Sequence, residues 1–110
     1  MRIQAGRDFA RLKAEGRRLV SGCLVANWSA LPPGSTSRVG LITTRRLGNA
    51  VVRNRARRLL RETFRRHQAD LAQPVDAVLV ARSSIVGKGL VEVERDFLAA
   101  MRKARLLRAS

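Results

Sequence analysis

Few side chains in this sequence could carry acid–base, nucleophilic or metal chemistry. The 110 residues include one histidine, His67, one cysteine, Cys23, and eight acidic residues. A hydrolytic site needs a general base with a proton donor, or several carboxylates that hold a metal ion. We interpret His67 as a favourable group at a helix C-terminus and Cys23 as a small buried side chain. The sequence therefore argues against an enzyme that works through its own side chains.

The acidic residues are scattered, and their densest group is Glu92, Glu94 and Asp96. At about 100° per residue on a helix, Glu92 and Asp96 share a face whereas Glu94 points elsewhere. We interpret these acids as ordinary ion-pairing residues of a helix, with Arg95 or Lys88 as partners, rather than as metal ligands.

Arginine dominates the chemistry that remains. The chain has 23 Lys and Arg against 8 Asp and Glu, which gives a net charge of +15. Nine arginines and one acid, Glu62, lie between Arg45 and Arg66, so this fifth of the chain carries 9 − 1 = +8. A guanidinium group binds phosphate oxygens through paired hydrogen bonds and stays charged at every relevant pH. This segment predicts a polyanionic partner, with nucleic acid first and an anionic membrane second.

The arginines gather on one side of a helix expected over residues 50–67, with Asn49 as its N-cap. Measured from Val52, the apolar side chains lie between about 340° and 120°, so this side is expected to pack in the core. The opposite side, between about 140° and 240°, holds Asn54, Arg57, Arg58, Arg61 and Arg65. We call the four arginines of that set the arginine stripe, which could follow a phosphate backbone for about 15 Å. Arg53 lies at about 100° from Val52 around the helix, so it is expected to point away from the stripe.

The rest of the chain predicts one small α+β domain over residues 1–110. Helices are expected over 7–15 and 90–107, and strands over 18–29 (one strand or a bent pair), 38–43 and 77–81. Gly16 is expected to end the first helix, and the last strand to be buried on both faces. This order predicts a sandwich of helices on a small sheet. Because no apolar run approaches the roughly 20 residues of a membrane span and no secretory signal is recognised, we expect a cytoplasmic protein without membrane contact.

The order of residues in the central segment is more specific than its charge. The run Gly48-Asn49-Ala50-Val51, followed by Arg53-Asn54-Arg55, resembles the signature of the protein subunit of bacterial ribonuclease P. The resemblance extends to Phe9 and Gly16, to Arg38-Val39-Gly40 and to the segment from Asp76 to Arg82. It implies an α-β sandwich with a left-handed βαβ crossover around the arginine-rich helix.

The resemblance also implies a function, which agrees with the small number of catalytic side chains. Ribonuclease P is a ribonucleoprotein that removes the 5′ leader from precursor tRNA, and its RNA subunit is the catalyst and holds the Mg²⁺ ions. The protein is expected to bind that RNA, lower its Mg²⁺ requirement and favour precursor over mature tRNA. The implied RNA-binding residues are Arg45, Arg46, Asn49, Arg53, Asn54, Arg55, Arg57, Arg58, Arg61 and Arg65. No catalytic or metal-binding residue is expected in the chain, which we expect to be monomeric without RNA.

The family has a cleft between its first helix and the sheet, and this cleft receives the single-stranded leader. Proteins bind single strands through aromatic stacking and cationic walls. Phe9 matches a family aromatic, whereas Lys13 and Asn27 stand where further aromatics are expected, and the chain has no tyrosine. Trp28, next to Asn27, is expected to point to the other face of the sheet. The resemblance therefore implies a leader-binding cleft with Phe9, Lys13 and Asn27.

Three other classes of protein fit parts of this pattern. A ribosomal or other RNA-binding module would share the charge but not the ordered motif. A nuclease made of protein alone would need more acids and histidines in one place. A basic membrane-surface helix would need bulky apolar residues opposite its arginines for insertion, and here the core needs those residues.

Overall fold

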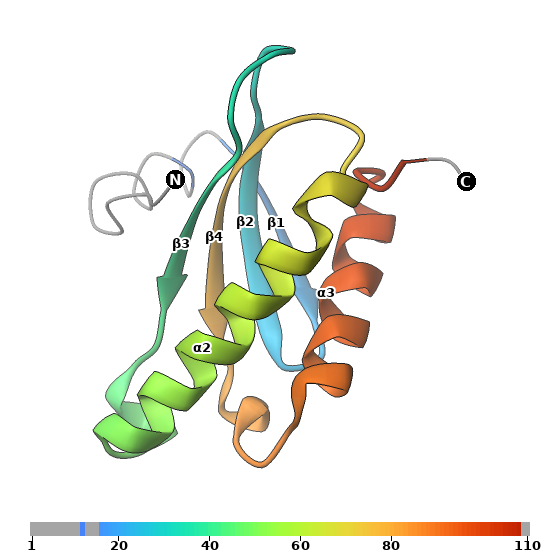
Figure 1. Ribbon diagram of the computed structural model, residues 1–110. Helices are drawn as coiled ribbons and strands as arrows, with labels where there is room; N and C mark the ends of the chain where they lie inside the picture. The colour runs from blue at the N-terminus through green and yellow to red at the C-terminus, as the bar shows by residue number, and fades with distance from the viewer. Residues whose placement is uncertain (1–11, 13–15, 109–110) are drawn as a thin grey trace.

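The computed structural model describes Leu12 and residues 16–108 of the chain. In this part a four-stranded sheet has the order β1-β2-β4-β3, and two helices cover one of its faces (Figure 1). The elements are β1 (Arg17–Ser21), β2 (Leu24–Ala30), β3 (Arg38–Ile42), α2 (Ala50–His67), β4 (Val75–Ala81) and α3 (Leu90–Lys103). The predicted α+β sandwich is confirmed, although most of the predicted helix over 7–15 lies outside the described residues.

The connection from β3 through α2 to β4 has an unusual hand. The two strands are parallel, while the β1–β2 and β2–β4 pairs are antiparallel. In Figure 1, α2 lies in front of the sheet, β3 and β4 run downward, and β4 is to the right of β3, so the crossover is left-handed. Nearly all such crossovers are right-handed. The hand implied by the resemblance is therefore confirmed.

The predicted bent pair of strands is a β-hairpin whose two-residue turn is Gly22 and Cys23. Gly22 has φ +53°, and a Cβ on it would lie 2.2 Å from Oδ2 of Asp96. Only glycine suits this conformation and this space. Gly16 has a different reason for being glycine, since a Cβ there would lie 2.6 Å from the carbonyl oxygen of Trp28. Both glycines therefore allow a close approach between segments.

The core lies mainly between the sheet and the two helices. Phe64 of α2 meets Phe97 of α3 edge to face, with ring centroids 6.2 Å apart. Trp28 is buried on this helix-covered side, as strand alternation predicts. The central strand β4 is buried on both faces, and on the other face Leu12 packs against Val78. The sheet is thus a rigid base for both helices.

The last helix is shorter than predicted, because it ends at Lys103 rather than at residue 107. Arg105 adopts a left-handed conformation with φ +59°, and the N–H of Leu106 donates to the carbonyl of Met101 at 2.9 Å. This reversal buries Leu106 and lets Leu107 form a β-bridge with Leu71. The usual glycine of this helix ending is absent from the sequence, so the apolar spacing predicted a longer helix.

Candidate nucleic-acid interface

The side chain of Asn49 fixes the start of α2, the helix that carries most of the predicted interface. Its Oδ1 accepts a hydrogen bond from the N–H of Val52 at 3.1 Å, which confirms the predicted N-cap. The residues of α2 that are buried against the core are Ala56, Leu60, Thr63 and Phe64. The capped, anchored helix presents its opposite side to solvent.

Three arginines of the stripe, Arg58, Arg61 and Arg65, are exposed on that side. Within residues 16–108, the side chains of Arg58 and Arg61 have no hydrogen bond or ion pair. Arg65 differs, because its Nη2 lies 2.5 Å from Oε1 of Glu62. Arg66 also pairs with Glu62, at 2.9 Å. Hydrogen bonds from Arg65 and Arg66 lower the pKa of Glu62 to about 2. The single acid of this segment is therefore ionised, and the surface keeps a large excess of positive charge.

The fourth arginine of the stripe, Arg57, is half-buried and tied to the rest of the fold. It donates to Oγ1 of Thr43 from Nε at 3.2 Å and from Nη2 at 3.0 Å. Its Nη1 donates to Oδ1 of the exposed Asn54 at 3.3 Å. Arg57 thus links α2 to the segment that follows β3, which the sequence analysis did not anticipate.

Two predicted arginines lie on the segment before α2. Arg45 and Arg46 are exposed on a single 3₁₀ turn, Arg45–Leu47, which buried Leu47 holds against the core. They extend the cationic surface beyond the N-terminus of α2.

Arg53, within α2, is different, because its side chain is half-buried and its Nε is buried without a hydrogen-bond partner among the described residues. This agrees with its predicted place at the edge of the apolar side.

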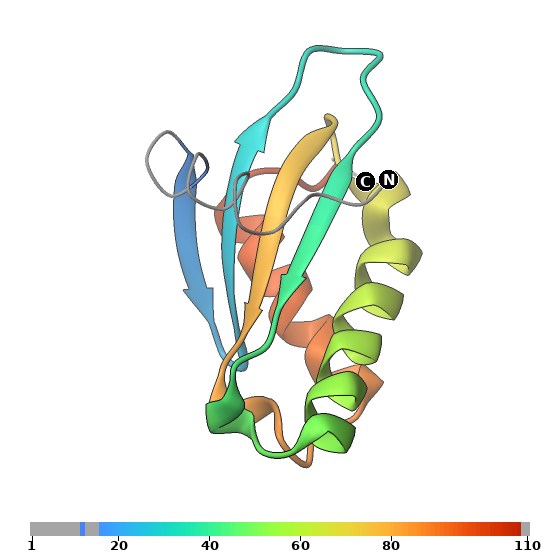
Figure 2. The ribbon, with the colours of Figure 1, turned by 90° about the vertical axis from the view of Figure 1, so that its left-hand side faces the viewer.

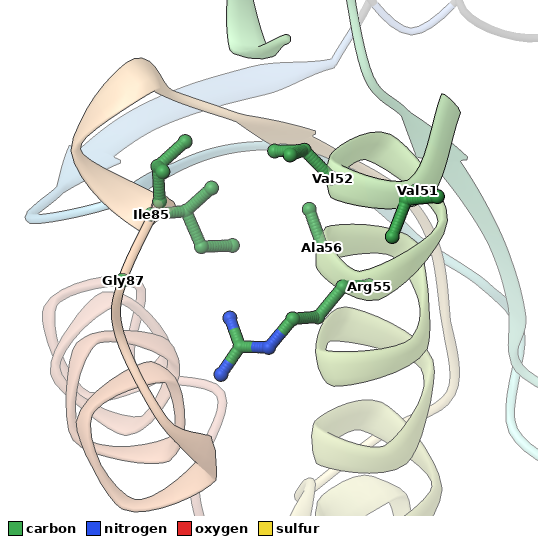
Figure 3. A pocket seen from close by; sticks show the side chains of 7 residues that line it. Val51, Val52, Arg55, Ala56, Ile85 and Gly87 are labelled. Carbon is green, nitrogen blue, oxygen red and sulfur yellow. The ribbon is translucent and has the colours of Figure 1, made fainter. Parts of the chain in front are cut away.

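Arg55, which is not part of the arginine stripe, extends toward the segment that precedes α3 (Figure 3). Its side chain borders a pocket of about 260 Å³. The other residues that line the pocket are Val51, Val52, Ala56, Ile85, Val86 and Gly87. Arg55 therefore places a cation over an apolar surface beside the arginine stripe.

The three acids predicted to form ion pairs on the last helix have three different roles. Oε1 of Glu92 accepts from the N–H of Gly89 at 3.0 Å, and its Oε2 lies 3.8 Å from the predicted partner Lys88. Glu94 contacts α2 instead: its Oε2 lies 2.8 Å from Nε2 of His67, and its Oε1 lies 3.6 Å from Nη1 of Arg66. Glu92 is thus the most exposed acid of this group, whereas Glu94 fixes α3 to the end of α2.

The predicted pairing of Asp96 with Arg95 is present, but the sequence did not predict that Asp96 is buried, with 8% of its surface exposed. Its Oδ2 accepts from the backbone N–H of Cys23 at 3.0 Å, while Arg95 approaches its Oδ1 at 3.4 Å. Burial of the hairpin turn against α3 explains the difference, and this contact spans 73 positions of the sequence.

No three His, Cys, Asp or Glu side chains of Leu12 and residues 16–108 lie together as a metal site. In the same part, neither helix has the length and apolar character needed to cross a bilayer. Cys23 is fully buried, as predicted, although it lies in a turn and not in a strand.

Of the three predicted leader-binding residues, Asn27 lies in the described part of the chain. Phe9 and Lys13 lie outside the described residues. Asn27 lies on β2, on the face of the sheet away from the helices, and is 2% exposed. Asn27 pairs in register with Val78, against which Leu12 packs.

Known proteins resemble this chain over nearly all of its length. The family model described as Ribonuclease P matches residues 1–105. The ribonuclease P protein component of Syntrophomonas wolfei is 36% identical over 107 residues, which cover 96% of this chain and 87% of the relative. The solved RNase P protein of Thermotoga maritima has a TM-score of 0.81 at 26% identity, covering 94% of this chain and 96% of its own. That of Staphylococcus aureus shares the fold, with a TM-score of 0.84 at 23% identity over 97% of both chains.

Proposed function

Because the chain belongs to the ribonuclease P protein family, we propose that it is the protein subunit of the ribonucleoprotein that removes the 5′ leader from precursor tRNA. The observation that carries this proposal is the exposed side of α2. There Arg58 and Arg61 have no partner within residues 16–108, and Arg65 shares Glu62 with Arg66. Such a surface is suited to the phosphates of a folded RNA.

In this proposal the chain supplies charge and position, and the RNA subunit supplies catalysis. Guanidinium groups of the stripe, together with Arg45, Arg46, Arg53 and Arg55, neutralise RNA phosphates and so lower the Mg²⁺ concentration that the RNA needs to fold. Asn49 and Asn54 add hydrogen bonds to sugar or base edges. Mg²⁺ ions held by the RNA subunit would activate water and stabilise the charge that develops on the phosphate.

A second part of the proposal concerns the choice of substrate. A cleft on the face of the sheet opposite the helices, with Phe9, Lys13 and Asn27, would hold the single-stranded leader. Because only the precursor carries a leader, this contact favours precursor over mature tRNA. Asn27 lies on that face but is 2% exposed, so in this proposal it supports the floor of the cleft and Phe9 and Lys13 meet the leader.

Cleavage of precursor tRNA under multiple turnover tests the function. We expect the RNA subunit with the chain to cleave much faster than the RNA alone at low Mg²⁺, and the difference to shrink at high Mg²⁺. The chain alone should cleave nothing. Equal rates with and without the chain would remove it from this enzyme, and cleavage by the chain without RNA would favour a nuclease made of protein.

Binding of the RNA subunit at several salt concentrations tests the electrostatic part. If about six phosphates are neutralised, the slope of log affinity against log salt should be roughly −4 to −5. An affinity that does not change with salt would contradict docking through arginine.

A further inference from the structure

A second cationic surface lies at the end of the molecule where β1 begins and α3 ends. Two strand residues, Arg17 and Arg18, and two residues from the end of the helix, Lys103 and Arg105, line a pocket of about 540 Å³. We call it the β1–α3 pocket, and its other lining residues are Leu19, Trp28 and Ala104. Within the described part of the chain none of the four cations has an acidic partner. The sequence analysis missed it, because about 85 positions separate its two halves.

Arg17 is held in place within this pocket. It lies opposite Trp28 in the β1–β2 register, and its guanidinium carbon is 5.9 Å from the centroid of the indole ring. A cation over an aromatic face is attracted by the ring and loses part of its side-chain freedom. Trp28 is 7% exposed, so its ring supports Arg17 and offers no open face for a stacked base.

Arg105 occupies a backbone conformation that does not suit arginine. It is the one non-glycine residue with positive φ in the described chain, at +59°, and it stands where helices usually end in glycine. Left-handed backbone is costly for a residue with a Cβ, and such strain commonly accompanies a functional demand. Favourable charge at the end of α3 accounts for Lys103. That favourable charge does not explain Arg105, which is exposed and lines the pocket although its backbone is strained.

We propose that the β1–α3 pocket binds backbone phosphates of the RNA subunit and is a second docking surface, separate from the arginine stripe. Four cations without acidic partners among the described residues favour an anionic ligand, and the lack of an open aromatic face among the lining residues favours phosphates over unstacked bases.

The position of the pocket indicates the size of the partner. β1 and β3 are the two edges of the sheet, and α2 lies on the β3 side (Figure 2). An RNA that reaches both the stripe and the pocket must be large and folded, which fits the RNA subunit. This inference rests on the proposed function.

Two variants separate binding from folding. Arg105→Gly removes the charge and relieves the backbone, so we expect an unchanged or higher Tm together with weaker binding. Lys103→Gln removes an exposed charge at the end of α3 without a change of backbone. Arg95→Gln is the control for charge on α3, because it removes one exposed charge two turns away from the pocket; since it also loses the 3.4 Å contact with Asp96, its Tm is measured with its affinity. Affinity of each full-length protein for the RNA subunit alone is measured from low to moderate salt.

We expect each pocket variant to bind the RNA subunit about 3- to 10-fold more weakly, with a salt slope shallower by roughly 1. Affinities and slopes equal to those of Arg95→Gln would overturn the inference. So would a loss confined to precursor tRNA binding by the assembled enzyme, since the pocket would then face the substrate. If Arg105→Gly fails to fold, Lys103→Gln decides by the same criteria. Failure of the proposed function would look different from failure of this inference, because the unmodified chain would then neither bind the RNA subunit nor stimulate cleavage.

Discussion

The backbone N–H of Cys23 donates a hydrogen bond of 3.0 Å to the carboxylate of Asp96, which joins the turn of the first hairpin to the middle of α3. The hydroxyl of Ser21 adds a second bond, to the carbonyl oxygen of Asp96 at 2.8 Å. Gly22 lies between them without a side chain, since a Cβ there would collide with the carboxylate. One acidic residue thus holds the edge hairpin in place.

Asp96→Ala should therefore destabilise the fold. It leaves the buried N–H of Cys23 without its acceptor, which costs about 1–3 kcal/mol. Burial alone would raise the pKa of Asp96, but the hydrogen bonds from Cys23 and Arg95 outweigh it and lower the pKa. The carboxylate then stabilises the fold above its unfolded pKa near 3.9, and this contribution disappears as pH falls through the lower folded value.

Urea denaturation at pH 7 and at acid pH measures this effect. The difference between Asp96→Ala and the unmodified chain should be large at pH 7 and shrink below about pH 4. Asp96→Asn, which keeps an acceptor oxygen at the same position but cannot ionise, is the control. A stability difference that does not change with pH would contradict the role assigned to the ionised group.

The thiol of Cys23 should not react in the folded protein. Burial, followed by the hydrogen bond with Asp96, raises the pKa of Cys23 to about 12, so almost no thiolate exists at pH 8. We expect Ellman's reagent to label the Cys23 thiol only in denaturant, with a labelling rate equal to the rate of unfolding. Rapid labelling of the native chain would show that the turn opens.

His67 should stabilise the fold most strongly at acid pH. Burial lowers the pKa of His67, but hydrogen bonds with Glu94 and Asp70 outweigh it and raise the pKa. Its contribution is fully present below the unfolded pKa near 6.5 and is lost as pH rises through the higher folded pKa. His67→Gln should remove this pH dependence of the free energy of unfolding. Because the chain has one histidine, its imidazole signals in NMR report the pKa directly.

Local patterns account for most of the fold. The N-cap Asn49, the apolar side of α2 and the alternation that buries Trp28 all follow from residues close together in the sequence, and the structure confirms them. The left-handed crossover came from a family resemblance, because no local pattern encodes the hand of a connection.

Long-range contacts explain what the sequence could not predict. The burial of Asp96 depends on a turn 73 positions away, and the end of α3 depends on Leu106 and Leu107 returning to the core near Leu71. The bond from Arg57 to Thr43 likewise requires α2 to fold back beside β3. Helical angles place an arginine on a side of the helix but do not show which neighbour it meets.

Two arginines of the stripe should therefore respond differently to substitution. Arg61→Ala removes an exposed cation without a partner in residues 16–108, so stability should stay within about 0.5 kcal/mol while RNA affinity falls and the salt slope becomes shallower by roughly 1. Arg57→Ala also breaks the bonds to Thr43, so it should lower stability by about 1 kcal/mol as well. Thermal unfolding and RNA binding measured on both variants check this. Equal effects on stability would mean that the Thr43 contact contributes nothing.

Phe9 tests the proposed leader cleft through a comparison of two substitutions. Phe9→Leu keeps an apolar side chain but loses the aromatic face, whereas Phe9→Ala loses both. If Phe9 stacks on a leader base, both variants should weaken binding of precursor tRNA by the assembled enzyme by about 5- to 150-fold, since stacking contributes about 1–3 kcal/mol per base. Binding of mature tRNA, which has no leader, should be unchanged. Should Phe9→Leu behave as the unmodified chain while Phe9→Ala unfolds, Phe9 would be a core residue, and the preference for the precursor would need another source on the sheet.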